Sequence, residues 1–199
     1  HDRVISLPEV RAIYQATFEI GELWGPLFRI LLLTGQRRGE IACLRWANID
    51  APNARIELES RQTKNRKPHI VHLSLPALTA LEARRQISGE TEFVFTTNGK
   101  TPSSGISKAK ARLDKLLGQD FSPWRLHDLR RSMATALAAS GIPEGVVDRI
   151  QNHAATSSAP SAVARVYQQA DLLPQRAAAL DRWADMVTDE TAIVVRIAK

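Results

Sequence analysis

The sequence predicts an α+β domain that is mostly helical, with a small three-stranded antiparallel sheet inserted among the helices. Apolar residues recur at helical spacing in several segments that begin with capping residues or end at glycine. Short segments such as ARIELES and HIVHLS instead alternate apolar and polar residues, as half-buried strands do. The chain has 199 residues, 44% of them hydrophobic and 24% charged, which is ordinary for a globular domain. We therefore expect a single domain over residues 1–199.

Capping residues and a glycine stop predict three helices at the start of the chain. Ser6 and Glu9 have the spacing of a capping box, with Pro8 in the first turn. Gly35 is typical of a residue that ends a helix. The three helices are expected at about 7–17, 23–34 and 37–45.

Alternating segments in the middle of the chain predict the sheet. The strands are expected at 54–60, 69–74 and 92–96, with a helix at 76–86 between the last two. The polar and basic segment RQTKNRKP at 61–68 joins the first two as a hairpin turn or longer loop.

The remainder of the chain returns to helical patterns. Gly141, Ile142 and Pro143 interrupt them. Helices are expected at about 104–117, 126–140, 144–151, 162–167 and 174–187, followed by a strand at 191–197.

The net charge and the composition of the chain indicate which kind of partner the protein binds and where it is located. The net charge of +6 favours a polyanion, with nucleic acid as the first candidate. The single cysteine, Cys43, excludes an internal disulfide, and no apolar run is long enough to span a bilayer. We expect a cytoplasmic protein without membrane contact. Because the chain opens at His1 and not at methionine, we also expect a fragment of a longer protein.

An arginine near the start of the helix expected at 126–140 is predicted to point towards the interior of the protein and not towards solvent. Arg130 lies at the edge of the apolar stripe, so its side chain is aimed towards the interior. An arginine there needs a partner. The partner could be a carboxylate, from Glu40 or Asp128, in a structural ion pair. It could instead be a phosphate, with His127 as a second donor.

A second arginine is predicted at a helix entrance. Arg37 follows Gly35 directly, and the exposed N–H groups and the dipole of a helix start favour an anion there. Glu40 would hold the turn, and Arg38 would be its exposed neighbour. Basic residues are mildly unfavourable at this position for structure alone, which indicates a function.

Further basic residues form two groups. The loop at 61–68 carries four cations with no acid between them, as a phosphate-contacting tip would. Three more share a face of the helix at 104–117, where spacing alone favours a solvated surface. These residues are Arg61, Lys64, Arg66, Lys67, Lys108, Arg112 and Lys115. The histidines lack metal-ligand spacing, and His69 and His72 read as ordinary strand residues.

The order of TGQRRGE, a hairpin lysine, HDLR, an Asn-His pair and a late tyrosine resembles the catalytic domain of the tyrosine recombinases, the phage integrase family. The C-terminal segment from Val166 to Val187 is similar to integrases of prophages and genomic islands. The resemblance spans nearly the whole chain and implies the tyrosine-recombinase catalytic fold. It assigns catalytic positions to Arg37, Lys64, His127, Arg130, His153 and Tyr167, with Tyr167 as the nucleophile. It makes Arg38, Arg61, Arg66, Lys67, Lys108, Arg112, Lys115 and Arg131 candidates for DNA contact.

The resemblance also implies a reaction. Family members cleave and rejoin double-stranded DNA through a 3′-phosphotyrosyl intermediate, without metal or cofactor, and so integrate or excise a mobile element. They act as tetramers on DNA. For the free fragment we expect a monomer that lacks the N-terminal DNA-binding domains.

Two departures and two alternatives accompany this interpretation. The family commonly has leucine-glycine where this chain has Gln151 and Asn152, although asparagine also tolerates a left-handed helix end. The interval from His153 to Tyr167 is long. A type IB topoisomerase-like enzyme would use similar chemistry, and a DNA-binding module with a decayed pocket would bind without cleaving.

Overall fold

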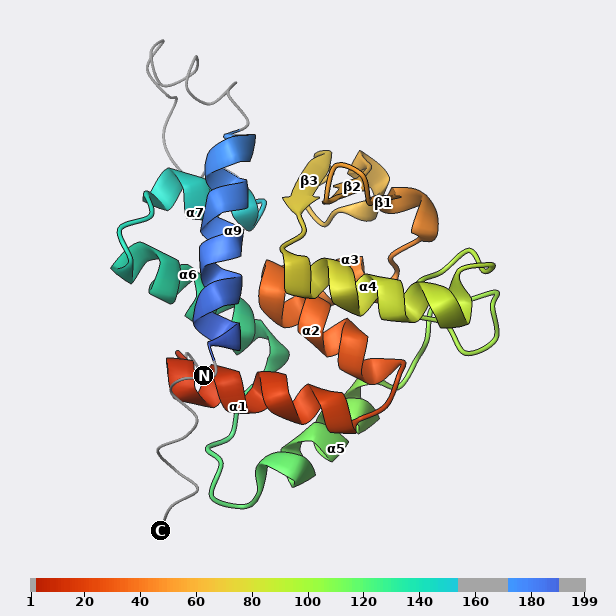
Figure 1. Ribbon diagram of the computed structural model, residues 1–199, viewed down its shortest axis with the longest axis horizontal. Helices are drawn as coiled ribbons and strands as arrows, with labels where there is room; N and C mark the ends of the chain where they lie inside the picture. The colour runs from red at the N-terminus through yellow and green to blue at the C-terminus, as the bar shows by residue number, and fades with distance from the viewer. Residues whose placement is uncertain (1–2, 154–171, 190–199) are drawn as a thin grey trace.

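Helix α2 (Trp24–Thr34) lies at the centre of the protein, and other helices pack around it (Figure 1). The computed structural model describes residues 3–153 and 172–189. The helices in contact with α2 are α1 (Leu7–Ala16), α3 (Arg38–Ala42), α4 (Leu75–Ser88), α6 (Leu126–Ala139) and α9 (Leu173–Thr188). The remaining α-helices described are α5 (Ile106–Leu117) and α7 (Glu144–Ile150), and short 3-10 turns occupy Thr17–Glu19, Trp46–Asn48 and Ser60–Gln62.

The predicted capping signals are confirmed. The backbone N–H and the hydroxyl of Ser6 both donate to the Glu9 carboxylate, at 3.0 and 2.7 Å. Gly35 ends α2 in the left-handed conformation, with φ +61°. The positive φ favours glycine, and a Cβ atom there would lie 2.3 Å from the Cε atom of Met133, so the methionine side chain would have to shift.

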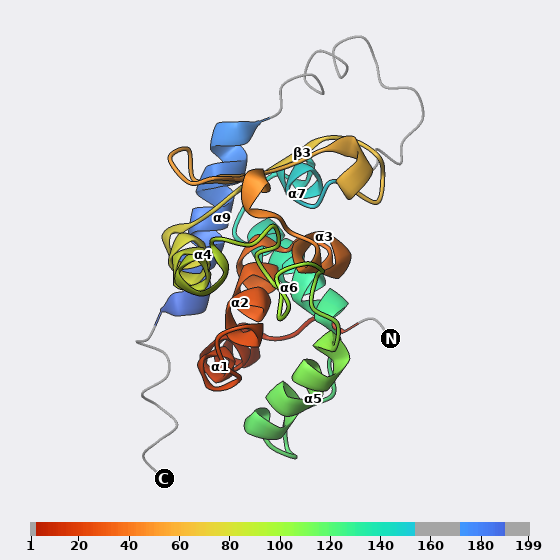
Figure 2. The same cartoon turned by 90° about the vertical axis from the view of Figure 1, so that its right-hand side faces the viewer.

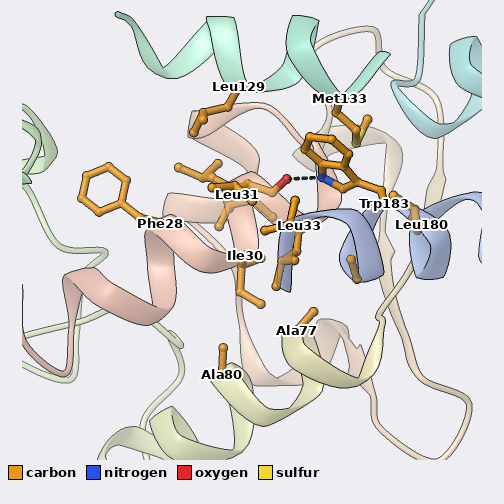
Figure 3. Close-up of a cluster of buried hydrophobic side chains, with 14 of the residues drawn as sticks. Phe28, Ile30, Leu31, Leu33, Ala77, Ala80, Leu129, Met133, Leu180 and Trp183 are labelled. Atoms are coloured by element: carbon orange, nitrogen blue, oxygen red, sulfur yellow. Dashed lines mark hydrogen bonds between the residues drawn. The ribbon is translucent and has the colours of Figure 1, made fainter. Parts of the chain in front are cut away.

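The central helix is buried on nearly every side, which explains its long apolar run (Figure 3). Helices α4, α6 and α9 each place side chains against it. The indole N–H of Trp183 in α9 donates to the carbonyl oxygen of Leu32, at 2.9 Å. This bond and the surrounding apolar contacts fix α9 against the core.

The three-stranded antiparallel sheet is confirmed, but one of its strands differs from the prediction. The strands are β1 (Ile49–Asp50), β2 (Arg55–Leu58) and β3 (His69–His72), in the order β1-β2-β3. Ile56 in β2 lies opposite Ile49 on one side and Val71 on the other. The two-residue β1 is too short to show alternation in the sequence.

The strand predicted at 92–96 is wrong. Phe93 makes only an isolated bridge with Arg45. Phe93, Val94 and Phe95 are all buried, so their apolar run reflects passage through the core and not one face of a sheet. Helix α3 ends at Ala42, earlier than expected, and the carbonyl oxygen of Leu44 accepts the backbone N–H of Val94.

The other predicted helices are present within a few residues of their expected bounds. In Figure 2, α3 and α5 lie towards the same side of the molecule. The predicted helix at 162–167 and the strand at 191–197 lie outside the described residues. Over residues 3–153 and 172–189, no helix combines the length and apolar character needed to cross a membrane.

Candidate active site

An open pocket of about 430 Å³ lies where the α2–α3 turn meets the N-terminal ends of α5 and α6. Three of the predicted catalytic residues line it together: Arg37, His127 and Arg130. The other lining residues are Leu31, Gln36, Arg38, Ser107, Lys110, Trp124, Arg125 and Leu126. Segments far apart in the sequence therefore place both guanidinium groups on one cavity.

Arg130 is buried, as the helical pattern predicts, with 4% of its surface exposed. Its guanidinium donates to the carbonyl oxygen of Gly35 at 2.7 Å and also to that of Gln151. Among the described residues it makes no ion pair with Glu40 or Asp128, the two carboxylates weighed as structural partners. Its fixed partners are therefore neutral, and they leave its charge available to an anion in the pocket.

The surroundings of Arg130 lower the pKa of its guanidinium group. Burial, and then the nearby charge of Arg37, lower the pKa of Arg130 to about 10. The side chain still carries its charge at neutral pH. Two cations held this close favour a bound anion that would relieve their repulsion.

Arg37 reaches the same pocket from the entrance to α3. Its backbone is extended, and its side chain is 23% exposed. The guanidinium contacts the Oε1 atom of Glu40 at 3.2 Å and donates to the carbonyl oxygen of Asn152 at 3.2 Å. Glu40 thus holds the turn, as expected, and also orients the arginine.

The loop between β2 and β3 shares both of these acceptors. The Glu40 Oε1 atom also accepts the backbone N–H of Lys64, at 3.3 Å. The carbonyl oxygen of Asn152 also accepts the side-chain amide of Asn65, at 2.9 Å. The loop that carries Lys64 is therefore bound directly to the supports of Arg37. The Lys64 side chain is exposed and does not line the pocket.

The two histidines predicted to act in catalysis differ in setting. Desolvation lowers the pKa of His127, and the charges of Arg130 and Arg131 lower it further, so its neutral form predominates at pH 7. His153 is exposed and is not among the residues that line the pocket, and its Nδ1 atom lies 3.1 Å from the Asp148 carboxylate. It follows Asn152, whose φ of +49° confirms the expected left-handed turn.

A third histidine was missed as part of the site. His69 is buried, with its Nε2 atom 3.1 Å from the Gln36 side-chain oxygen and 3.2 Å from the carbonyl oxygen of Ile150. Burial, followed by the charge of Arg176, lowers the pKa of His69 to about 3. A neutral His69 therefore links β3 to the α2–α3 turn and to the end of α7. Alternation along β3 carried this signal, since its inward face includes position 69.

The predicted DNA-contact residues lie in four places. Arg38 lines the pocket. Arg61, Arg66 and Lys67 are exposed on the loop between β2 and β3, where Arg61 pairs with Glu59 at 2.8 Å, and Arg131 is half-buried on α6. Lys108, Arg112 and Lys115 are exposed along α5 but do not line the pocket.

Helix α5 contributes different residues to the pocket, namely Ser107 and Lys110. The Lys110 ammonium lies 4.0 Å from the ring centre of Trp124 and 2.6 Å from Asp114. Spacing alone favours a solvated surface for the neighbouring cationic stripe, and the contact with Trp124 shows that Lys110 is the lysine turned inward.

The predicted nucleophile and the metal-ligating side chains are the last two features of the candidate site. Tyr167, the predicted nucleophile, lies outside them. Within residues 3–153 and 172–189, no three histidine, cysteine, aspartate or glutamate side chains gather as a metal site.

The arrangement of helices and sheet is that of the tyrosine recombinase catalytic fold. It is similar to XerA recombinase, with a TM-score of 0.67 and 21% identity over 85% of this chain and 64% of that one. It is also similar to the lambda integrase catalytic core, with a TM-score of 0.61 and 22% identity over 77% of this chain and 96% of that one.

The sequence gives the family directly. Residues 4–169 match the phage integrase family. Prophage integrase IntA of Escherichia coli K12 is 31% identical over 85% of this chain and 40% of its own length, and prophage integrase IntZ is 28% identical over 94% and 45%. The chain therefore belongs to the phage integrase family. It spans less than half the length of these relatives.

Proposed function

We propose that residues 1–199 form the catalytic domain of a site-specific DNA recombinase of the prophage integrase type. The convergence of Arg37 and Arg130 on one pocket carries this proposal. The substrate is double-stranded DNA at attachment sites, and the setting is the cytoplasm. A lambda integrase tetramer bound to a Holliday junction shares the fold, which supports assembly of a tetramer on DNA.

The two arginines would each grip a non-bridging oxygen of the scissile phosphate. Phosphoryl transfer spreads negative charge over these oxygens, and fixed cations stabilise it with little reorganisation. The carbonyl bonds to Arg130 supply the fixed geometry. Exposed Arg38 and the loop cations would contact neighbouring phosphates.

The covalent step would use residues of three different segments. The phenolic oxygen of Tyr167 attacks phosphorus, and the bond from phosphorus to the 5′ oxygen breaks. Lys64 gives a proton to the departing oxygen, while the phenol proton passes to a histidine, for which neutral His127 is the candidate. A 5′ hydroxyl from another strand reverses the step and completes strand exchange.

The test is covalent capture on a nicked duplex that loses a short 5′ fragment after cleavage. The unmodified chain should give a protein–DNA adduct on a denaturing gel. Tyr167→Phe should give none while still shifting DNA in a native gel. An undiminished adduct from Tyr167→Phe would refute the nucleophile assignment.

The same assay separates the two alternatives. A decayed binding module would shift DNA in a salt-sensitive manner but form no adduct with any substrate. A relaxing enzyme would form the adduct but reseal only the original strands. Joining of differently labelled strands would establish recombination.

A further inference from the structure

We propose that Asn65 and Asn152 are positioning residues that hold the loop of Lys64 against the pocket. In that position the Lys64 ammonium group can give a proton to the leaving 5′ oxygen. The inference rests on the proposed function, because it assumes that Lys64 is the acid. It assigns a role to two residues outside the set of predicted catalytic groups.

The two side-chain amides pair with each other. The Asn65 nitrogen donates to the side-chain oxygen of Asn152 at 2.7 Å, and the Asn152 nitrogen donates back to the Asn65 oxygen at 3.2 Å. The second N–H of Asn65 is directed to the Asn152 carbonyl oxygen at 2.9 Å. This amide pair spans from the β2–β3 loop to the end of α7.

Hydrogen bonds within the loop connect its backbone to Asn65. The Thr63 hydroxyl donates to the carbonyl oxygen of Lys67 at 2.7 Å, and the Lys67 N–H donates to the Asn65 side chain at 3.3 Å. Arg66 occupies the left-handed region at φ +57°, which tightens the turn. Fixing Asn65 therefore fixes the backbone of the adjacent Lys64.

Lys64 depends on such a support more than the arginines do. Its side chain is exposed and flexible, so its backbone position decides what its ammonium can reach. One tie is its own N–H bond to Glu40, at 3.3 Å. The paired side chains of Asn65 and Asn152 hold the backbone a second time, at the residue that follows Lys64.

Asn152 suits this task in a way that glycine would not. Both residues tolerate the observed φ of +49°, but only asparagine adds a side-chain amide. Asn152 is 9% exposed, so its amide is held by protein partners. Its backbone carbonyl serves Arg37 separately, at 3.2 Å. Replacing Asn152 with glycine should remove both bonds between the two side chains and leave intact the bonds that the carbonyl oxygen of residue 152 accepts from Arg37 and Asn65.

The experiment compares two DNA substrates with Asn152→Gly and Asn65→Ala. One substrate has the natural 5′ oxygen at the scissile bond, and the other has a 5′ bridging sulfur, which leaves as a thiolate without needing a proton. General-acid catalysis contributes about 10²–10⁴-fold. We expect both variants to cleave the oxygen substrate at least about 10-fold more slowly and the sulfur substrate within about 3-fold of the unmodified rate.

The Lys64→Ala variant tests whether Lys64 is the general acid. Asn53→Gly and Lys100→Ala are matched controls at exposed positions. If the unmodified chain forms no adduct, or if sulfur does not rescue Lys64→Ala, the proposed function or its acid fails, and the inference falls with it. If sulfur rescues Lys64→Ala but Asn152→Gly and Asn65→Ala match the unmodified rate, only the inference is overturned. Equal slowing of both variants on both substrates would show a purely structural pair and would also overturn it.

Discussion

Arg37 and Arg130 donate to the carbonyl oxygens of consecutive residues at the end of α7, Asn152 and Gln151. One short backbone segment therefore sets the position of both guanidinium groups. His153, a third candidate group, follows directly in the sequence. Changes to either arginine should thus disturb geometry as well as charge.

Arg130→Lys should cleave DNA at least about 100-fold more slowly although the charge is kept. A lysine has one ammonium group and cannot reproduce the planar contacts to Gly35, Gln151 and a phosphate together. Single-turnover cleavage measures the effect, with exposed Arg182→Lys as the control. A near-normal rate would make Arg130 a structural residue only.

Glu40→Ala should reduce both stability and cleavage. It would leave Arg37 without its carboxylate and remove the acceptor of the Lys64 N–H. The expected loss is about 1–3 kcal/mol of unfolding free energy, as for other buried hydrogen-bonded groups. Glu40→Gln keeps an acceptor and should lose less. Urea denaturation measures the unfolding free energy of both variants. Equal losses for Glu40→Ala and Glu40→Gln would contradict the role of Glu40 in orienting Arg37.

His69 should make the protein less stable as the pH falls. The unfolded chain takes up its proton near pH 6.5, whereas folded His69 stays neutral until about pH 3. Between these values the unfolded state binds more protons, so stability rises with pH and is lost on acidification. This residue alone should cost about 2 kcal/mol between pH 6.5 and 5.

Urea denaturation of the unmodified chain and of His69→Gln over this pH range gives the measurement. The difference in unfolding free energy between the two should shrink as the pH falls. A constant difference would show that His69 is protonated in the folded protein.

Gly35→Ala should destabilise the protein by about 1–2 kcal/mol or more, because alanine is strained at this positive φ. The added methyl group would also meet the Met133 side chain. Gly39→Ala is the matched control, since a Cβ there meets nothing within 4 Å. The midpoint of thermal unfolding distinguishes them, and equal shifts would contradict the requirement for glycine at 35.

Local chemistry made much of this molecule predictable. The Ser6 capping box, the Gly35 stop and the inward aim of Arg130 each follow from interactions within a few residues, and each was confirmed. The misplaced strand at 92–96 shows the limit. Its apolar run is set by contacts with Leu44 and Arg45, which are distant in sequence.

The supports of the site were less predictable than its charged groups. Asn65 and Gln36 act through partners on other elements, and no local pattern marks them. The side-chain placement of Lys110 likewise depends on Trp124, which belongs to the loop before α6. Tyr167 remains a prediction from the resemblance.

The reliance of Arg130 on neutral carbonyl partners bears on how the protein is handled in solution. The pocket holds Arg37, which pairs with Glu40, and Arg130, which makes no ion pair among the described residues, so it should attract small tetrahedral oxyanions as well as DNA. Sulfate or phosphate in a buffer should therefore act as a competitive inhibitor, and orthovanadate, which can adopt five-fold coordination, should inhibit more strongly than either.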